Sequence, residues 1–367
     1  MLQTAPYAPF RRLPSGARIL IAFSGGVDSA VTAALALRAG YQVTAVHMTL
    51  LPGGEESRRK AEETAAKLGI ELVHADCSEV FECAVLRPSW EMCKSGHTPN
   101  PCTICNPAVK FGSLMPLMDQ YGCAAFATGH YAKVIDAPDG HTILARGSYR
   151  EKDQSYFLFG LSQEQLARVV FPLGGMTKPE VREIARELGL PNAESKESQD
   201  TCFTPPGKTA AEFLHEHFGE TVPGGTFVSE PDGRVLGRHG GIHAFTIGQR
   251  KGTGVAMGVP AWVSRIDAEE NKVWITTDPD DLLRDSLVLP RVHWTAKPPE
   301  TEVFRAQVQI RYRSKPANAE ITLAPDGAVS IRFEVPQRAV TPGQVAVIYD
   351  GEILLGGGRI PGGQVLH

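Results

Sequence analysis

Apolar runs and amphipathic stretches alternate through the first part of the chain. A short apolar run bounded by turn residues is typical of a buried strand, and apolar residues three or four positions apart are typical of a helix. The predicted strands are residues 18–23, 41–48 and 70–75, and the predicted helices between them are residues 30–39 and 55–68, each followed by a glycine. Strands that alternate with helices in this order predict a parallel sheet with crossover helices.

The same pattern continues, more weakly, to about residue 190. Residues 126–134 predict another strand, and residues 163–171 and 179–188 predict two further helices. Thr177 and Glu180 have the spacing of a capping box at the start of the second of these helices. The first part of the chain is therefore expected to be an α/β unit.

The pattern changes after about residue 208. Short β-rich runs such as HAFTI, AWVSRI, KVWITT, AEITL, VSIRF and QVAVIY follow, separated by turns rich in Gly, Pro and Asp. The chain is therefore predicted to be an α/β protein of three domains: a Rossmann-like domain with a parallel sheet at residues 1–208, a small β-rich central domain at 209–284 and a C-terminal β-barrel at 285–367.

Length and composition agree with this division. The 367 residues suit two or three domains, and 42% hydrophobic with 21% charged residues is the composition of a globular protein. No apolar run reaches the ~20 residues of a membrane-spanning helix, and the N-terminus lacks the apolar segment of a secretory signal, so a cytoplasmic protein with no membrane partner is expected. The formal net charge is −4, so a nucleic-acid partner would have to be met by a local basic patch.

A glycine-rich loop, SGGVDS at residues 24–29, lies between the first predicted strand and the first predicted helix. Its two glycines let backbone N–H groups approach phosphate oxygens, the helix N-terminus adds the positive end of a dipole, and the Ser24 and Ser29 hydroxyls can donate further hydrogen bonds. A Walker loop needs a lysine that reaches the β- and γ-phosphates. No Lys or Arg stands between Arg18 and Arg38, so the loop is predicted to bind phosphate for a different reaction.

Seven cysteines lie before residue 203 and none lies after it. An odd number in a chain of this length favours metal or sulfur chemistry in a reducing compartment over a disulfide framework. Cys102 and Cys105 are predicted to lie in a proline-punctuated loop, residues 97–111 (HTPNPCTICNPAVKF), a poor place for buried core thiols, and Cys202 follows much later. Three others, Cys77, Cys83 and Cys123, are predicted to be small buried hydrophobic residues.

Three kinds of chemistry fit the remaining cysteines. In sulfur transfer, Cys202 carries a persulfide and Cys105 is its thiolate partner. In an iron–sulfur site, Cys102, Cys105 and Cys202 bind three irons of a 4Fe–4S cluster. In a zinc site, the ligands are Cys93, His97, Cys102 and Cys105. The spacing leaves all three open, together with incidental thiols.

A basic strand is predicted at residues 307–315. Val308, Ile310 and Tyr312 alternate with polar residues that include Arg311, so one face of the strand is apolar and the other is rich in hydrogen-bond donors. Such a face suits phosphates and sugars, although an ordinary solvated strand has the same pattern. The loop 248–254 adds Arg250 and Lys251 in a setting that also fits RNA.

Several motifs in order resemble one family. The loop SGGVDS resembles the PP-loop of the ATP pyrophosphatase superfamily, whose members cleave ATP between the α- and β-phosphates. Together with TPNPxxxCN, ATGHY, KDQSYFL, FTIGQRKG and TPGQ, it resembles the bacterial tRNA-uridine 2-sulfurtransferases over nearly the whole chain.

The resemblance implies roles for individual residues. ATP with Mg²⁺ would bind the loop Ala22, Phe23, Ser24, Gly25, Gly26, Val27, Asp28 and Ser29, with Met48 and Gly129 in the adenosine pocket. Cys105 would be the nucleophile and Cys202 the persulfide intermediate. The residues implied to contact the target base are Asn100, Pro101 and Cys102, and those implied to contact tRNA are His130, Lys152, Asp153, Gln154, Arg311, Tyr312 and Gln344. Without the resemblance, Met48 is a core residue, Asp153 a helix cap and His130 a strand-end histidine with a partner.

The chain departs from the family pattern at one position. Many members have Asp where this chain has Cys102. A third soft ligand beside Cys105 and Cys202 favours the cluster hypothesis more than the family pattern does, so persulfide relay and cluster-assisted sulfuration both stay open.

The implied activity is ATP-dependent 2-thiolation of the wobble uridine, position 34, of tRNA. The implied partners are Lys, Glu and Gln tRNAs and a sulfur-relay protein or cysteine desulfurase, with the enzyme itself a monomer. Two rivals use only part of the sequence: a PP-loop enzyme of the amidotransferase type leaves the cysteine motifs unused, and a zinc-stabilised RNA-binding protein leaves SGGVDS unused.

Overall fold

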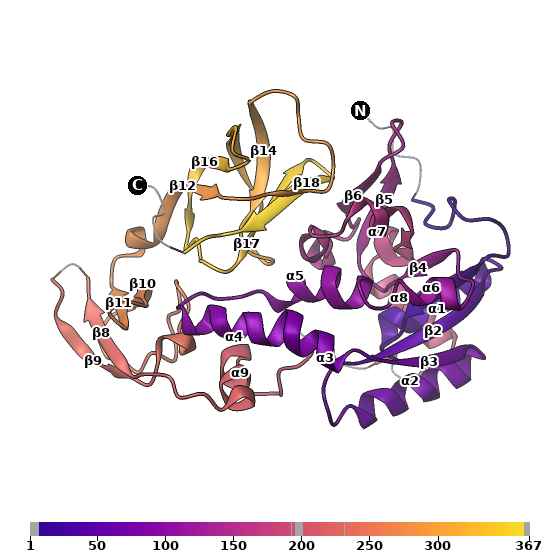
Figure 1. Cartoon of the computed structure of the whole chain (residues 1–367), viewed down its shortest axis with the longest axis horizontal. Coiled ribbons are helices and arrows are strands. Elements are labelled where there is room, and N and C mark those ends of the chain that lie inside the picture. Colours follow the sequence, from indigo (N-terminus) through magenta and orange to yellow (C-terminus); the bar gives the residue numbers. More distant parts are fainter. Residues whose placement is uncertain (1–6, 192, 195–200, 231, 363–367) are drawn as a thin grey trace.

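The computed structural model describes residues 7–191, 193–194, 201–230 and 232–362. Figure 1 shows a parallel-sheet unit, a small sheet at the other end of the molecule and a larger antiparallel sheet between and above them. The α/β, central β-rich and barrel-like parts of the sequence prediction are confirmed.

The first sheet has five parallel strands in the order β3-β2-β1-β4-β7. They are β1 (Arg18–Ala22), β2 (Gln42–Thr49), β3 (Glu71–Asp76), β4 (Ala125–Ala127) and β7 (Val169–Val170). Ile19 and Ile21 of β1 pack on one side of the sheet, while Leu20 packs on the other. The sheet is thus buried on both faces, which explains the nearly continuous apolar run of its first strand.

Helices cover this sheet. Six α-helices precede or cover its strands: α1 (Val27–Arg38), α2 (Glu55–Leu68), α3 (Ser78–Phe81), α4 (Arg87–Lys94), α6 (Leu117–Gln120) and α8 (Lys178–Glu187). The predicted capping box is present, because Thr177 and Glu180 each accept a backbone hydrogen bond from the other at the start of α8. Gly69 ends α2 with φ +67°, as its position in the sequence predicts.

Two predicted elements are wrong in part. The single strand predicted at 126–134 is broken at Thr128–Tyr131 into β4 and β5 (Ala132–Asp136), which belong to different sheets. The helix predicted at 163–171 is only α7 (Gln163–Ala167), followed by the short strand β7. In both places a change of direction falls inside one apolar run, so periodicity gave no sign of it.

The proline-rich segment forms a helix that changes its winding. The α-helix α5 (Pro101–Cys105) continues directly into a π-helical segment, Asn106–Phe111, and a second π-helical segment, Glu82–Leu86, precedes α4. Single π-helical turns occur frequently at functional sites. The π-helical segment Glu82–Leu86 contacts α5, and Figure 1 shows α4 and α5 along the middle of the molecule.

The central part is a four-stranded sheet in the order β10-β11-β8-β9. Its strands are β8 (Gly225–Ser229), β9 (Val235–His239), β10 (Trp262–Asp267) and β11 (Lys272–Thr276), and α9 (Ala210–Phe218) precedes them. The run HAFTI (residues 243–247) is not a strand, because its first two residues belong to a 3₁₀ turn at Ile242–Ala244. Phe227, Val263 and Ile275 form a small core of their own.

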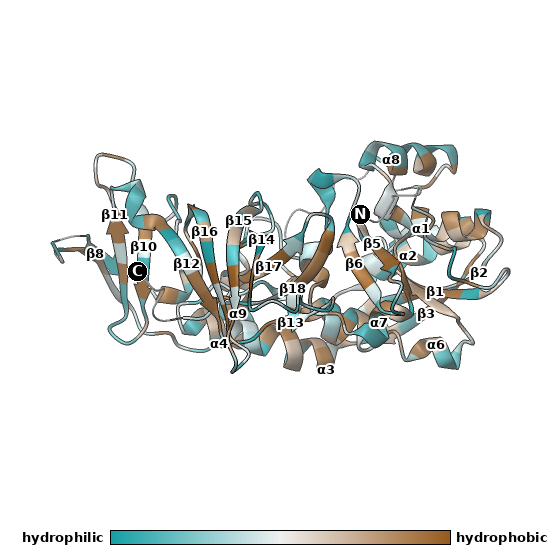
Figure 2. Cartoon of the chain, turned by 90° about the horizontal axis from the view of Figure 1, so that it is seen from above, coloured by the Kyte–Doolittle hydropathy of each residue, from teal (hydrophilic) through white to brown (hydrophobic). Residues whose placement is uncertain are grey.

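The third sheet is antiparallel and barrel-like. In order it contains β12 (Leu283–Leu289), β16 (Val329–Arg338), β15 (Ala317–Leu323), β14 (Val303–Gln309), β17 (Val345–Asp350), β18 (Ile353–Arg359), β6 (Thr142–Arg146) and β5, with β13 (His293–Trp294) paired to β18. Figure 2 shows hydrophobic and hydrophilic positions alternating along these strands. The hairpin β5–β6 comes from the first part of the chain, so the sheet joins two regions far apart in sequence.

The basic strand predicted at 307–315 is wrong in its second half. Strand β14 ends at Gln309, and Arg311 and Tyr312 lie in the turn that follows. Gln309 is buried, and its side-chain amide donates hydrogen bonds to the backbone carbonyls of Arg311 and Tyr312 at 3.1 and 2.7 Å. The polar positions therefore do not form one outward basic face. None of the helices described is long and apolar enough to cross a membrane.

Candidate active site

The glycine loop lies at the carboxyl edge of the parallel sheet, between β1 and α1. Gly25 has φ +72°, and a Cβ at this position would lie 2.6 Å from the backbone nitrogen of Ala61 in α2, so only glycine fits. Ser24 and Gly26 are exposed, while Ser29 is buried and donates to the Gly26 carbonyl at 3.0 Å. Within the described chain no side chain caps α1, which leaves its first N–H groups suited to phosphate oxygens.

Asp28, in the first turn of α1, has two partners from distant parts of the chain. The Lys178 ammonium donates to both carboxylate oxygens at 2.7 and 2.8 Å, and the Tyr131 hydroxyl donates to one of them at 2.8 Å. The Lys178 side chain is 10% exposed and that of Asp28 is 37% exposed. The loop, which has no lysine of its own, thus receives a cation from the first turn of α8.

Sequence reasoning missed Lys178 and Tyr131. A signal for Lys178 was available, because a helix that follows a strand of a parallel sheet starts at the carboxyl edge, where ligands bind in such folds. Lys178 occupies the first position of that helix. Its role as a helix former was apparent from the capping box, but its position near the loop depends on the sheet order.

The two predicted adenosine residues lie at the same edge. Met48 is half-buried near the end of β2 and packs against the core. A Cβ at Gly129, after β4, would lie 2.9 Å from the Asp28 Cβ, so this glycine allows the loop after β4 to pack against the phosphate loop. Contact of either residue with a nucleotide stays a prediction.

The three cysteines singled out by sequence lie near enough to one another to interact electrostatically. Cys105 is buried and Cys102 is half-buried on α5, whereas Cys202 is exposed. The side-chain amide of Asn106, the residue after Cys105, donates to the carbonyls of Cys102 and Phe157 at 3.0 and 3.2 Å and so fixes the α5 turn. Asn100 is the N-cap residue of α5 and Pro101 its first residue.

The thiols influence one another electrostatically. Burial raises the pKa of Cys105 to about 12 and that of Cys102 to about 11. The Lys110 ammonium, on the π-helical segment, lowers the pKa of all three, while Cys202 raises the pKa of the other two. The structure therefore brings Cys102, Cys105 and Cys202 around one cation that sequence reasoning had not named.

The zinc hypothesis finds no support in this arrangement. Cys93 faces the hydrophobic core from α4, where burial raises its pKa to about 12. His97 packs near Gly362 and Arg359 at the end of the chain. Among the residues that the structure describes, no three His, Cys, Asp or Glu side chains are grouped so that they could hold a metal ion. Of the other cysteines, Cys77 and Cys123 are buried as predicted, but Cys83 is exposed, because it points outward from the π-helical segment before α4.

His130, an implied tRNA contact, is 8% exposed. Its Nδ1 is 2.7 Å from the Thr128 hydroxyl, and its ring stacks on Phe111 with centroids 6.2 Å apart. Burial, with a contribution from Lys110, holds the pKa of this imidazole well below its usual value, so it is neutral at pH 7. This geometry is that of a strand-end histidine with a partner, and contact with tRNA stays a prediction.

Two side chains of the KDQ motif (residues 152–154) also form hydrogen bonds within the protein. Asp153 is buried and accepts from the Arg146 guanidinium at 3.0 Å and from the backbone N–H groups of Gly147 and Ser155 at 3.0 and 3.1 Å. Asp153 is not the cap of the 3₁₀ turn Ser155–Leu158, because the N-cap residue of this turn is Gln154 and no side chain caps it. Gln154 accepts from the Tyr131 backbone at 3.1 Å, and Lys152 is half-buried.

The implied tRNA contacts of the barrel hold the domains together. One Arg311 nitrogen donates to the Ile247 carbonyl at 2.9 Å and to the Thr341 hydroxyl. The centroid of the Tyr312 ring lies 4.2 Å from the centroid of the Phe157 ring. The Gln344 amide donates to the carbonyls of Thr98 and Pro99 at 2.9 and 3.4 Å. Contact of Arg311, Tyr312 and Gln344 with tRNA is therefore still a prediction.

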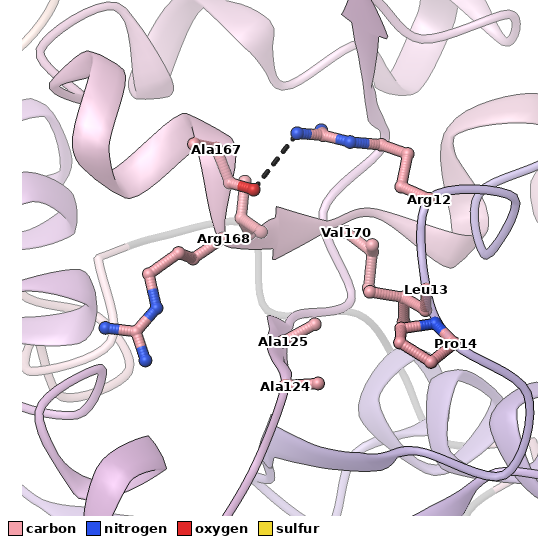
Figure 3. Close-up of a pocket in the computed structure, with 9 residues that line it drawn as sticks. Arg12, Leu13, Pro14, Ala124, Ala125, Ala167, Arg168 and Val170 are labelled. Atoms are coloured by element: carbon pink, nitrogen blue, oxygen red, sulfur yellow. Dashed lines mark hydrogen bonds between the residues drawn. The ribbon is translucent and has the colours of Figure 1, made fainter.

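Two hollows lie apart from these residues. A cavity of about 190 Å³ lies at the amino ends of β4 and β7, the opposite edge of the sheet from the phosphate loop, and Arg12 crosses it to donate to the Ala167 carbonyl at 3.0 Å (Figure 3). A second hollow of about 410 Å³ is lined by Arg250, Thr253 and residues 255–261. Neither contains the cysteines.

A parallel sheet with a phosphate loop at its carboxyl edge, followed by two barrel-type β units, defines a PP-loop protein of the HUP class. Three family models match successive parts of the chain: a tRNA methyl transferase HUP domain at residues 17–206, a tRNA methyl transferase PRC-barrel domain at 211–277 and an aminomethyltransferase β-barrel domain at 284–360. The chain belongs to the family of tRNA-specific 2-thiouridylases.

Curated relatives support this assignment over nearly the full length. The tRNA-specific 2-thiouridylase MnmA of Syntrophotalea carbinolica is 44% identical, with 93% of this chain and 98% of that protein covered. The same-named protein of Acidithiobacillus ferrooxidans is 42% identical, with 94% and 98% covered. A solved 4-thiouridine synthetase in complex with RNA and ATP is 20% identical, with a TM-score of 0.34, and covers 56% of this chain and 51% of its own.

Proposed function

We propose that the protein catalyses ATP-dependent 2-thiolation of the wobble uridine, position 34, of tRNA, with Cys202 as the sulfur carrier and Cys105 as the nucleophile. The observation that carries the proposal is the gathering of Cys105 and Cys202 beside Lys110 in a chain whose phosphate loop suits ATP. The relatives named as tRNA-specific 2-thiouridylases supply the substrate class.

The first step uses the phosphate loop. The C2 oxygen of uridine attacks the α-phosphorus of ATP, pyrophosphate leaves, and the poor leaving oxygen becomes part of AMP. The loop N–H groups and the first turn of α1 bind the phosphates. Asp28 has carboxylate oxygens suited to Mg²⁺ and is already paired with Lys178, so the two side chains together present one negative and one positive group to the pyrophosphate.

The second step uses the cysteines. The terminal sulfur of a Cys202 persulfide attacks C2 and AMP leaves. The Cys105 thiolate then attacks Cys202 Sγ, which breaks the bond to the transferred sulfur and forms a Cys105–Cys202 disulfide. A dithiol reductant must reduce this disulfide by two electrons, and a sulfur-relay protein or desulfurase must reload Cys202. The exposure of Cys202 suits reloading by a protein, while burial of Cys105 protects it from unwanted partners.

A second route to the same product is favoured by one observation, that Cys102 adds a third thiol to the pair. Three thiolates are a donor set that suits an iron–sulfur cluster, but among the described residues Cys102, Cys105 and Cys202 are not grouped closely enough to hold a metal ion, so these three ligands would have to move together to hold it. Such a cluster would supply an iron with an open position for sulfide. In this route Cys202 needs no persulfide, and Cys102 becomes essential.

Substitution of Cys202 by serine tests the proposal. We expect Cys202→Ser to abolish the mass gain of tRNA that accompanies replacement of oxygen by sulfur, while tRNA-dependent pyrophosphate release continues, because the phosphate loop is intact. Cys83→Ser, at another exposed cysteine, is the matched control and should thiolate normally. Undiminished thiolation by Cys202→Ser would contradict the proposal. Cys102→Ser distinguishes the routes, since only the cluster route requires this thiol.

The proposed partners are Lys, Glu and Gln tRNAs, and the protein is proposed to act as a monomer in the cytoplasm. Thiolation assays with these three tRNAs, beside a tRNA with another wobble base, test the substrate set.

A further inference from the structure

The segment that leads into the cysteine helix is held by both β domains. The Thr98 backbone N–H donates to the Pro342 carbonyl at 2.8 Å, and the Thr98 carbonyl accepts from the Gln344 amide at 2.9 Å. The Thr98 hydroxyl bonds to that of Thr246, in the central part of the chain, at 3.0 Å. The N–H, the carbonyl and the hydroxyl of Thr98 are therefore each hydrogen-bonded to a segment that lies almost 150 or more residues away in the sequence.

Gly343 makes this contact possible. It has φ +87°, and a Cβ at this position would lie 2.9 Å from the backbone nitrogen, carbonyl carbon and oxygen of Thr98. Real Cβ atoms do not approach backbone this closely, and the backbone of Thr98 has no flexible end that could move aside. The TPGQ turn therefore packs directly against the Thr98 backbone.

The central and barrel parts are fixed to each other at the same place. Arg311 connects the Ile247 carbonyl to the Thr341 hydroxyl. A Cβ at Gly248 would lie 2.7 Å from the Cβ of Ala339, so these two segments also touch. The surfaces that hold Thr98 are thus rigidly related to one another.

A displacement of Thr98 passes directly to the thiols. Only Pro99 and Asn100 separate it from α5, whose first residue is Pro101 and which carries Cys102 and Cys105. Two prolines in this short connection fix φ at both positions and remove the freedom that would absorb a shift.

From these contacts we infer that Thr98, Thr246 and Gly343 form an interdomain clamp that positions Cys105 for sulfur transfer. They are positioning residues, because each acts through the Thr98 backbone and α5. The inference rests on the proposed function for its effect on turnover, but the placement of Cys105 can be measured without it. Loosening the clamp should lower the rate of the sulfur-transfer step and leave adenylation unchanged, because the hydrogen bonds of the clamp do not involve the phosphate loop.

The test uses a matched pair of glycine variants in the full chain. Gly343→Ala inserts a methyl group against Thr98, whereas Gly327→Ala changes a barrel glycine with φ +86° whose Cβ would meet no atom within 4 Å. Both variants carry the same backbone strain, so their difference isolates the contact. We expect Gly343→Ala to lower kcat for thiolation by roughly 10- to 100-fold relative to Gly327→Ala, with tRNA-dependent pyrophosphate release unchanged.

The second readout is alkylation of the free protein by iodoacetamide, followed by peptide mass spectrometry. Gly343→Ala should change the labelling rates of Cys102 and Cys105 severalfold, while buried Cys123 stays as in Gly327→Ala. Thr246→Val, which removes one hydrogen bond with little change in shape, should shift labelling in the same direction. Thr226→Val, in the same domain, is its control.

The outcomes separate the clamp from the proposed function. Equal labelling and equal kcat in Gly343→Ala and Gly327→Ala, with no effect of Thr246→Val, would overturn the clamp. If the unsubstituted protein fails to thiolate tRNA, the proposed function fails, and the labelling comparison still decides whether the clamp positions the cysteines. Should Gly343→Ala not fold, Thr246→Val decides.

Discussion

The Lys110 ammonium is half-buried beside thiols rather than carboxylates. Among the described residues it has no hydrogen bond or ion pair of its own, yet its charge lowers the pKa of Cys102, Cys105 and Cys202. Burial and Lys110 therefore shift the pKa of the thiols in opposite directions. In the proposed mechanism the thiols stay protonated until Lys110 stabilises the thiolate that forms during sulfur transfer.

Replacement of Lys110 by methionine should raise the thiol pKa values further. Below those pKa values the thiolate fraction rises with pH, so loss of the cation should move the alkylation profile of Cys105 to higher pH and slow labelling at pH 8 by roughly tenfold. Lys208→Met is the control, because this lysine is exposed and paired with Glu216. An unchanged profile for Lys110→Met would mean that Lys110 does not act on the thiols.

Individual site residues differ in how far sequence could predict them. The loop SGGVDS lies between a strand and a helix, as predicted, but Cys102 and Cys105 lie on the helix α5, with Cys105 buried, where a proline-punctuated loop was predicted. The partners Lys178 and Lys110 could not be identified from periodicity, because their function depends on which elements lie beside them. Arg311 was assigned to an outward strand face, but strand β14 ends before it and the side chain turns toward Ile247.

At the scale of elements, α8 illustrates both success and failure. Its start, its capping box and its end near residue 188 follow from local sequence. Its apolar face packs against the helix and strand of the phosphate loop through Val181 and Ala185. This packing places the first turn of α8 over the carboxyl edge of the sheet and so delivers Lys178 to Asp28, an outcome of topology rather than of local pattern.

Lys178→Met should impair adenylation specifically. The substitution removes the Lys178 hydrogen bonds to the Asp28 carboxylate but keeps the one from the Tyr131 hydroxyl. It also removes a positive charge from the phosphate-binding edge. Loss of one preorganised donor to a developing charge typically costs about 100-fold in kcat, so we expect a decrease of that size in tRNA-dependent pyrophosphate release. Sulfur loading of Cys202 should be unaffected. Arg186→Met, on the exposed side of α8 and paired with Glu194, is the control; equal pyrophosphate release by the two variants would exclude the proposed role.

At the scale of the whole molecule, the barrel and the first domain share a sheet. Hairpin β5–β6 pairs with β18, so the KDQ motif that follows the hairpin lies against the barrel. There the Arg146 guanidinium lies 3.4 Å from the centre of the Tyr349 ring and bonds to Asp153 and Gln309. The sequence divided the chain into consecutive domains, and it could not show this pairing because β5 had been joined to β4 in one predicted strand.

Asp153→Asn should weaken this junction strongly. The carboxylate of Asp153 accepts from three donors, and an amide has one oxygen, so its NH₂ group must face at least one of them and the buried Arg146 charge loses its partner. Removing one partner of a buried ion pair costs about 3–5 kcal/mol. The same carboxylate-to-amide change at Glu334, paired with the exposed Arg305, should cost less than about 1 kcal/mol. Urea denaturation measures both, and equal losses would mean that the buried pair contributes no more to stability than the exposed one.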